Sequence, residues 1–311
     1  MSSVESTVPL TPLSPASLRP SWLSTPAFPF ESRFLSLGRT RFHYVDEGQG
    51  PTLLFLHGGP MSSFMWRHQL AELRSRYRCV AVDLPGLGLS TTPLVRGEGF
   101  AHMADALQAF VQELRLEQLT LLVHATGGPS GLEMAIREQK RVRALVISNT
   151  FGWPLETDPG LAPMVRLVST RLFRFLVVRF NLLPQVASRK GRRTSKLTAE
   201  ERAAILGPYR DRAARLHLAN LLYGLRAEAP FFVRLEERMP QLAHLPTLLL
   251  FGGQDSGYRG GTLTRFEKLL PRHTTVVLPR AAHFLTEDEP EAYTAALYRW
   301  LSQLSGTTTA E

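Results

Sequence analysis

Short apolar runs alternate with helical patterns along much of the chain, and this alternation limits the folds open to it. Runs of four or five residues, each bounded by polar residues or glycine, are typical of buried parallel strands. Amphipathic helical patterns separate them, and strands joined by helices form a parallel sheet. We therefore predict an α/β fold, with such strands at 52–56, 79–82, 119–123 and 144–148 and helices at 63–74, 102–114 and 128–138.

The two ends of this region extend the sheet. Residues 34–37 and 41–45 form a predicted hairpin around Gly38. Near the C-terminus the alternation returns, with strands at 247–251 and 274–278 and helices at 264–270 and 291–304. We predict one α/β core, built from residues 31–151 and 240–306, with a mostly parallel central sheet flanked by helices.

Residues 152–239 interrupt this core and show only helical patterns, at 164–183, 199–206, 212–225 and 231–238. We interpret them as a helical cap inserted after the sixth strand. Such a cap lies over the carboxyl ends of the strands, where ligands bind in open α/β sheets. Its many Leu, Phe and Val side chains, including Leu172, Phe173 and Phe175, favour either an apolar pocket or packing of the cap onto the core.

The N-terminal residues and the cysteine content indicate the cellular compartment of the protein. Residues 1–30 are rich in Ser, Pro and Thr and lack the charged and apolar blocks of a secretory signal, which predicts a disordered or loosely draped tail. The chain has one cysteine, Cys79, so it cannot have an internal disulfide framework, and this is typical of a reducing compartment. We expect a cytoplasmic protein.

The chain is basic, and its positive charge could indicate an anionic partner. The formal net charge is +9, and Arg189–Arg193 is its densest cluster. We expect no nucleic-acid partner, because an arginine-rich composition is also common without one. The apolar, arginine-studded helix at 164–183 is compatible with a membrane surface, but a core-facing cap helix has the same pattern, so we expect no membrane contact. The sequence does not indicate an oligomeric state.

The segment Val123-His-Ala-Thr-Gly-Gly-Pro129, between a predicted strand and a predicted helix, has the context of a nucleophile elbow. Small residues follow the nucleophile position, as Gly127 and Gly128 do here. The position itself is Ala125, whose methyl group cannot attack carbon, and whose Cβ is strained in so tight a turn. Thr126 has a hydroxyl, but we expect its side chain to point away from the site.

Three further loops follow predicted strands. Asp255 and His283 come after the elbow in the order of an α/β-hydrolase triad, so Asp255 would orient the His283 imidazole and His283 would act as general base. In His57-Gly-Gly-Pro60, the Gly59 amide can point at a developing oxyanion. We predict a hydrolytic site without a metal or a cofactor.

These loops resemble the haloalkane dehalogenase branch of the α/β-hydrolases, to which epoxide hydrolases and β-lactone decarboxylases are close. The resemblance covers roughly residues 34 to 304 and is carried by residues 57–67, 82–90, 123–129, 149–154 and 283–290. It implies an aspartate nucleophile at position 125, which forms an alkyl-enzyme ester. Water activated by His283 then hydrolyses this ester, while the amides of Gly59 and Thr126 hold the oxyanion.

The departures from this family concern the ligand contacts. Gly59 and Thr126 replace a side-chain amide and an indole that hold the halide in dehalogenases, and Trp153 is a candidate third donor. Tyr209 and Tyr223 lie in the cap, where epoxide hydrolases have tyrosines that protonate the epoxide oxygen. Our candidate substrate contacts are His124 of the elbow, Trp153, Tyr209 and Tyr223.

Ala125 leaves three hypotheses. The first is a hydrolase of a hydrophobic small molecule, such as an alkyl halide, an epoxide or a strained lactone or ester, in which Ala125 replaces the nucleophile, with aspartate favoured over serine. The second is a natural homologue without a nucleophile, which binds a ligand or uses His283 as a base. The third is a membrane or nucleic-acid accessory protein that reuses the fold, through Arg189–Arg193.

Overall fold

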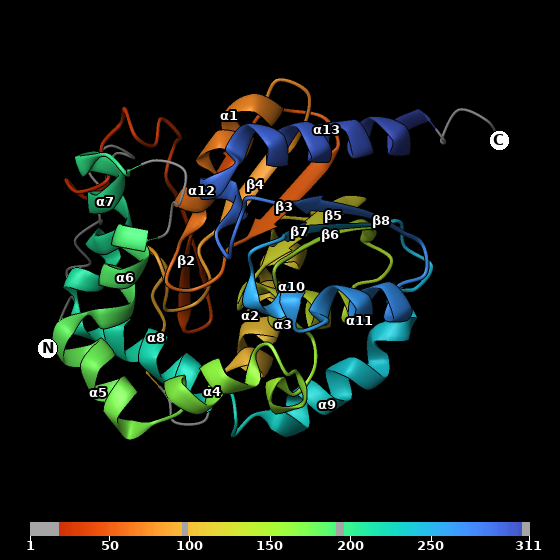
Figure 1. Cartoon of the computed structure of the whole chain (residues 1–311). Helices are drawn as coiled ribbons and strands as arrows, with labels where there is room; N and C mark the ends of the chain where they lie inside the picture. The colour runs from red at the N-terminus through yellow and green to blue at the C-terminus, as the bar shows by residue number, and fades with distance from the viewer. Residues whose placement is uncertain (1–18, 95–98, 191–195, 307–311) are drawn as a thin grey trace, which may run out of the picture.

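A computed structural model describes residues 19–94, 99–190 and 196–306. Eight strands of these residues form one sheet in the order β1-β2-β4-β3-β5-β6-β7-β8 (Figure 1). The β1–β2 and β2–β4 pairs are antiparallel and the remaining pairs are parallel. The strands are β1 (Arg33–Leu37), β2 (Thr40–Glu47), β3 (Thr52–Leu56), β4 (Arg78–Val82), β5 (Leu119–His124), β6 (Val142–Ser148), β7 (Thr247–Gly252) and β8 (His273–Leu278).

All the predicted strands are present, with ends that differ by at most two residues. They could be predicted because each is short, apolar and bounded by turn residues. The helices of the core also lie where the sequence places them. These are α1 (Arg67–Leu73) after a 3₁₀ turn at Ser63–Trp66, α2 (Phe100–Glu113), α3 (Gly127–Arg137), α11 (Thr262–Leu269) and α13 (Pro290–Gly306). Two short helices, α10 (Ser256–Arg259) and α12 (Leu285–Asp288), were not predicted.

The inner parallel strands β3 to β7 are covered on both faces, as their continuous apolar sequences require. Successive side chains of a strand point to opposite faces, so Leu54 and Leu56 of β3 pack with α2 and α3, whereas Leu53 and Phe55 pack with α1 and α13. The two apolar layers hold the ends of the strands in register. The loops that follow the strands therefore start from fixed points.

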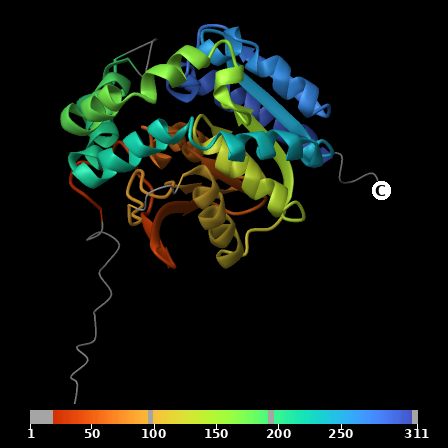
Figure 2. The same ribbon diagram turned by 90° about the horizontal axis from the view of Figure 1, so that it is seen from below.

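Between β6 and β7 the described residues form no strand, and we retain residues 152–239 as the proposed cap. The cap helices α5 to α7 lie at the end of the molecule opposite the C-terminal end of α13 in both views (Figures 1 and 2). The helices are α4 (Ala162–Val168), α5 (Arg171–Phe180), α6 (Leu182–Lys190), α7 (Ala199–Leu206), α8 (Arg212–Gly224) and α9 (Ala229–Arg238).

The single helix predicted at 164–183 is wrong, because the structure divides this segment among α4, α5 and α6. Thr170 ends the first break by accepting a hydrogen bond from the Phe173 amide at 3.1 Å, as a helix N-cap does. Asn181 makes the second break with φ of +55°, a left-handed conformation that asparagine tolerates better than most residues. The apolar periodicity continues through both breaks, so the sequence pattern does not reveal them.

Part of the N-terminal segment is packed. Leu23, Phe28 and Phe30 are buried in the apolar layer that contains Trp66. The Arg19 guanidinium donates hydrogen bonds to backbone carbonyls of this segment, including that of Leu23 at 2.8 Å. The expectation of a disordered or draped tail is therefore wrong for residues 19–30, because their aromatic side chains find a place in the core. Residues 1–18 and most of the Arg189–Arg193 cluster lie outside the described residues.

Candidate active site

The elbow between β5 and α3 has the strained backbone that its sequence predicts. Ala125 has φ of +46°, in the left-handed region that costs a residue with a Cβ roughly 1–2 kcal/mol. The two glycines after it are required by close packing. A Cβ on Gly127 would lie 2.3 Å from the His57 carbonyl oxygen, and one on Gly128 would lie 1.8 Å from the Thr150 hydroxyl. The elbow thus presents Ala125 at the end of β5.

Asp255 and His283 form a hydrogen-bonded pair at the ends of the neighbouring strands β7 and β8. His283 Nδ1 lies 2.8 Å from Asp255 Oδ2, and the other carboxylate oxygen accepts the Gly257 amide at 2.8 Å. Burial alone would raise the pKa of Asp255, but the hydrogen bond and charge of His283 outweigh it and lower the pKa. Asp255 is buried and the His283 side chain is 44% exposed, so the imidazole faces outward from a fixed anion.

His124 is buried and holds the backbone of the His283 loop. Its Nε2 lies 2.8 Å from the His283 carbonyl oxygen. Burial, helped by the charge of His283, lowers the pKa of His124 to about 3, so the ring is neutral and Nε2–H is the donor. The prediction that His124 contacts substrate gains no support from this position, since the side chain is fully buried and one nitrogen is already bonded.

Asn149, which follows β6, is a positioning residue that our sequence analysis missed. Its side-chain amide donates to the carbonyl oxygens of Ala282 at 2.8 Å and His283 at 3.0 Å, and its oxygen accepts the Gly252 amide at 3.0 Å. It therefore joins the loops after β6, β7 and β8. The only signal in the sequence is an asparagine directly after a strand, which is common in turns of every kind.

The predicted oxyanion donors have an unexpected arrangement. The Gly59 amide donates a hydrogen bond to the Thr126 hydroxyl oxygen at 2.8 Å. The expectation that the Thr126 side chain points away from the site is therefore wrong, because its hydroxyl turns back over the loop that contains Gly59. A Cβ on Gly59 would lie 2.9 Å from Leu218 of α8, so the cap packs directly on this loop.

The other three candidate contacts, Trp153, Tyr209 and Tyr223, differ in their burial and in their hydrogen bonds. Trp153 is fully buried, and its indole N–H faces Asp158 Oδ2 at 3.3 Å, so the donor is already in use. Tyr223 lies on α8 and is 38% exposed. The Tyr209 hydroxyl is buried without a hydrogen-bond partner among the described residues. Burial, with the charge of Asp83, raises the pKa of Tyr209, so it stays protonated and remains a candidate donor.

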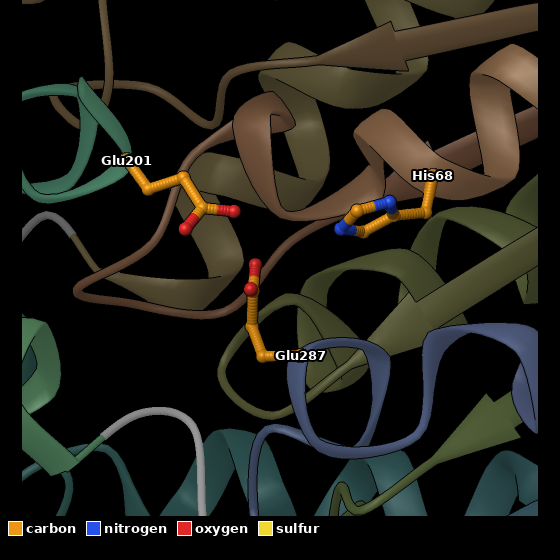
Figure 3. Close-up of side chains that lie close together, drawn as sticks. All are labelled: His68, Glu201 and Glu287. Atoms are coloured by element: carbon orange, nitrogen blue, oxygen red, sulfur yellow. The ribbon is translucent and has the colours of Figure 1, made fainter. Parts of the chain in front are cut away.

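One cluster outside the site has the side chains of a metal centre. His68 of α1, Glu201 of α7 and Glu287 of α12 point toward one another (Figure 3). The buried Arg67 guanidinium lies within hydrogen-bond distance of both carboxylates, at 2.7 Å from Glu287 Oε2 and 2.8 Å from Glu201 Oε1. A cation would have to displace this guanidinium. We therefore assign the carboxylates to an ion-pair network that joins the cap to the core.

A cavity of about 150 Å³ opens beside His283. Its walls are mainly apolar and come from α6 of the cap and from the loop after β8, and they include Leu183, Val186, Ala187 and Phe284. The imidazole is thus reached through an apolar space. This arrangement suits a small hydrophobic ligand, because apolar walls with a few polar groups are typical of such sites.

Comparison with known proteins places this geometry in a family. The family model described as alpha/beta hydrolase fold matches residues 51–290. Haloalkane dehalogenase 2 of Mycobacterium tuberculosis is 35% identical over 277 residues, which cover 87% of this chain and 94% of that protein. A cis-3-alkyl-4-alkyloxetan-2-one decarboxylase of Shewanella oneidensis is 28% identical, covering 84% of this chain and 85% of its own.

Solved structures agree with the sequence comparisons. The crystal structure of an ancestral haloalkane dehalogenase superposes with a TM-score of 0.77 at 26% identity, covering 88% of this chain and 99% of that one. A haloalkane dehalogenase from Bradyrhizobium elkani gives a TM-score of 0.80 at 24% identity, covering 89% and 99%, and supports the fold. The chain belongs to the α/β hydrolase fold family, as a haloalkane dehalogenase-like member.

Proposed function

We propose that the site is that of a hydrolase for a small hydrophobic substrate, and that the form with Ala125 is inactive in covalent catalysis. The observation that carries the proposal is the elbow conformation of Ala125 together with an intact Asp255–His283 pair. The names of the relatives support a small hydrophobic substrate, since the relatives include haloalkane dehalogenases and an oxetanone decarboxylase. An alkyl halide, an epoxide and a strained lactone or ester are therefore the substrates to try.

The missing step is the formation of a covalent ester. With aspartate at position 125, a carboxylate oxygen would attack the substrate carbon, and the leaving group would depart with the bonding electrons. His283 would then take a proton from water while the water oxygen attacks the ester carbonyl; the alkoxide that leaves takes up the proton from His283 and departs as an alcohol, and the carboxylate of residue 125 is regenerated. Asp255 would stabilise the His283 imidazolium formed in this step. Aspartate also tolerates the left-handed backbone of position 125 better than alanine does.

The test is to prepare Ala125→Asp and Ala125→Ser and to assay an alkyl halide, an epoxide, a β-lactone and an aryl ester. We expect turnover by Ala125→Asp on at least one of them. Ala125→Asn is the matched control, because it has nearly the shape of aspartate without the nucleophilic carboxylate. Absence of turnover by both the Asp and Ser variants on all four substrates would reject the proposal.

A second candidate is a natural homologue without a nucleophile, which binds a ligand or uses His283 as a base. The hydrogen bond between the Gly59 amide and the Thr126 hydroxyl favours it, because it occupies a donor that an oxyanion would need. This candidate predicts that the protein with Ala125 has chemistry of its own, which His283→Ala removes. Activity that survives His283→Ala would exclude this use of the base.

A further inference from the structure

The cap leaves a cluster of large apolar side chains in solvent. Six of the nine exposed large apolar side chains of the described residues lie on α4–α6. Leu172 is 66% exposed, Leu167 is 59% exposed, and Phe175 and Phe180 are exposed to a similar extent. Such a concentration is unusual on a protein surface and marks a contact with something else. We call these six residues the α4–α6 patch: Met164, Leu167, Leu172, Phe175, Phe180 and Val186.

The three helices of this patch carry exposed arginines and no acid. Arg166, Arg171, Arg179 and Arg189 are all exposed on the same three helices. The sequence has no Asp or Glu between Asp158, which is buried, and Glu200 at the start of α7. On α8, which packs against α5, the nearest acid is the N-cap residue Asp211. The exposed surface of these three helices is therefore apolar and positively charged.

Contrary to the expectation of no membrane contact drawn from the sequence pattern, we propose that the α4–α6 patch binds the surface of an anionic phospholipid bilayer. An apolar face bordered by basic side chains lies at such an interface, with the apolar residues among the acyl chains and the arginines at the lipid phosphates. A second copy of the chain is a poorer partner. In a symmetric dimer the same surface meets itself, so it would bring like-charged arginines together.

The position of the patch relative to the candidate site supports this partner. Val186 belongs to the patch and also lines the cavity beside His283. A bilayer held on the patch would thus lie next to the opening of that cavity. An apolar molecule dissolved in the bilayer could pass to His283 with little exposure to water. This last step rests on the proposed function, whereas the lipid contact itself does not.

Lipid binding is tested by co-sedimentation of the full chain with vesicles of phosphatidylcholine containing about 30% phosphatidylglycerol. We expect the partition coefficient to fall by about tenfold or more in Leu172→Ser/Phe175→Ser, and also in Arg171→Gln/Arg179→Gln. The matched controls are Val233→Ser on α9 and Arg299→Gln on α13, which are exposed elsewhere and should bind as the unchanged protein does. Circular dichroism verifies that each variant is folded.

Two results would overturn the proposal. One is a lack of binding of the unchanged protein to the anionic vesicles, or binding of the patch variants that is as strong as that of the unchanged protein. The other is a concentration-dependent dimer, seen by light scattering, that Leu172→Ser/Phe175→Ser abolishes while vesicle binding is absent. Since the measurement contains no substrate, failure of the proposed hydrolase activity does not affect it, and failure of lipid binding leaves the activity assay valid.

Discussion

Two histidine–aspartate pairs of this protein have the same geometry in different surroundings. His43 Nδ1 lies 2.8 Å from Asp83 Oδ2, and His283 Nδ1 lies 2.8 Å from Asp255 Oδ2. The first pair even has a serine in place, since Ser32 Oγ lies 3.0 Å from His43 Nε2. Both side chains of that pair are only 1% exposed, so no substrate reaches them. The second pair has no nucleophile, but its imidazole is open to ligands.

The two positions in the sheet explain this contrast. His43 lies in β2 and Asp83 directly follows β4, and these two strands pair antiparallel. Asp83 also accepts hydrogen bonds from the amides of Ser63 and Leu89. The carboxylate thus fastens loops to the sheet. Asp255 and His283 follow two parallel strands whose carboxyl ends share one edge of the sheet, where ligands bind. A hydrogen-bonded Ser, His and Asp are therefore not enough to define a catalytic site, because a substrate must also be able to reach them.

The largest effect should separate the two histidines in catalysis. In an Ala125→Asp background, we expect His283→Ala to lower turnover by about 10³-fold or more, because no base then activates water. The alkyl-enzyme ester should accumulate and appear as an added mass in intact-protein mass spectrometry. Ser32→Ala in the same background is the control and should leave turnover unchanged. A loss with Ser32→Ala as large as that with His283→Ala would contradict the comparison.

Stability should show the opposite order. We expect Asp83→Ala to lower the free energy of unfolding by about 3–5 kcal/mol, because it leaves buried donors and a buried histidine without their partner. Asp255→Ala should cost only about 1–2 kcal/mol, mainly through loss of the cap on α10. Urea denaturation measures both values. If Asp255→Ala proves the more costly change, the division between a structural and a functional pair fails.

The pH dependence of stability should show whether His124, the buried histidine that holds the His283 loop, is neutral in the folded protein. The pKa of His124 is about 3 in the folded protein, against 6.5 for an ordinary histidine. Between these values the unfolded chain binds more protons, so stability falls as the pH falls. Between pH 6.5 and 4.5 this group should cost about 2 kcal/mol. His124→Gln should reduce the slope in urea denaturation, and an unchanged slope would show that His124 is not kept neutral.

The smallest effect concerns the hydrogen bond between the Gly59 amide and the Thr126 hydroxyl. In the Ala125→Asp background, Thr126→Ala should raise turnover by about tenfold, because it frees the Gly59 amide for the oxyanion. Thr126→Ser keeps the hydroxyl and is the matched control, which should leave turnover unchanged. A fall in turnover with Thr126→Ala would instead mean that the hydroxyl itself donates to the ligand.

The sequence alone determined the architecture and the order of the loops. Short apolar runs predicted the inner strands β3 to β7, because a parallel strand buried on both faces has a nearly continuous apolar sequence. The glycines at 127 and 128 and the residues after β7 and β8 predicted the elbow and the Asp255–His283 pair, because strand ends fix where these loops begin. The strain at Ala125 followed from the tight turn in the same way.

Only the tertiary structure decided which side chains face one another or face solvent. Thr126 turned toward Gly59, Asn149 joined three loops, and the packing of Phe28 and Phe30 ordered residues 19–30. The apolar face of α5 gives the clearest case, since periodicity shows that a face exists and cannot show what covers it. That depends on the orientation of the whole helix against its neighbours, which distant residues set.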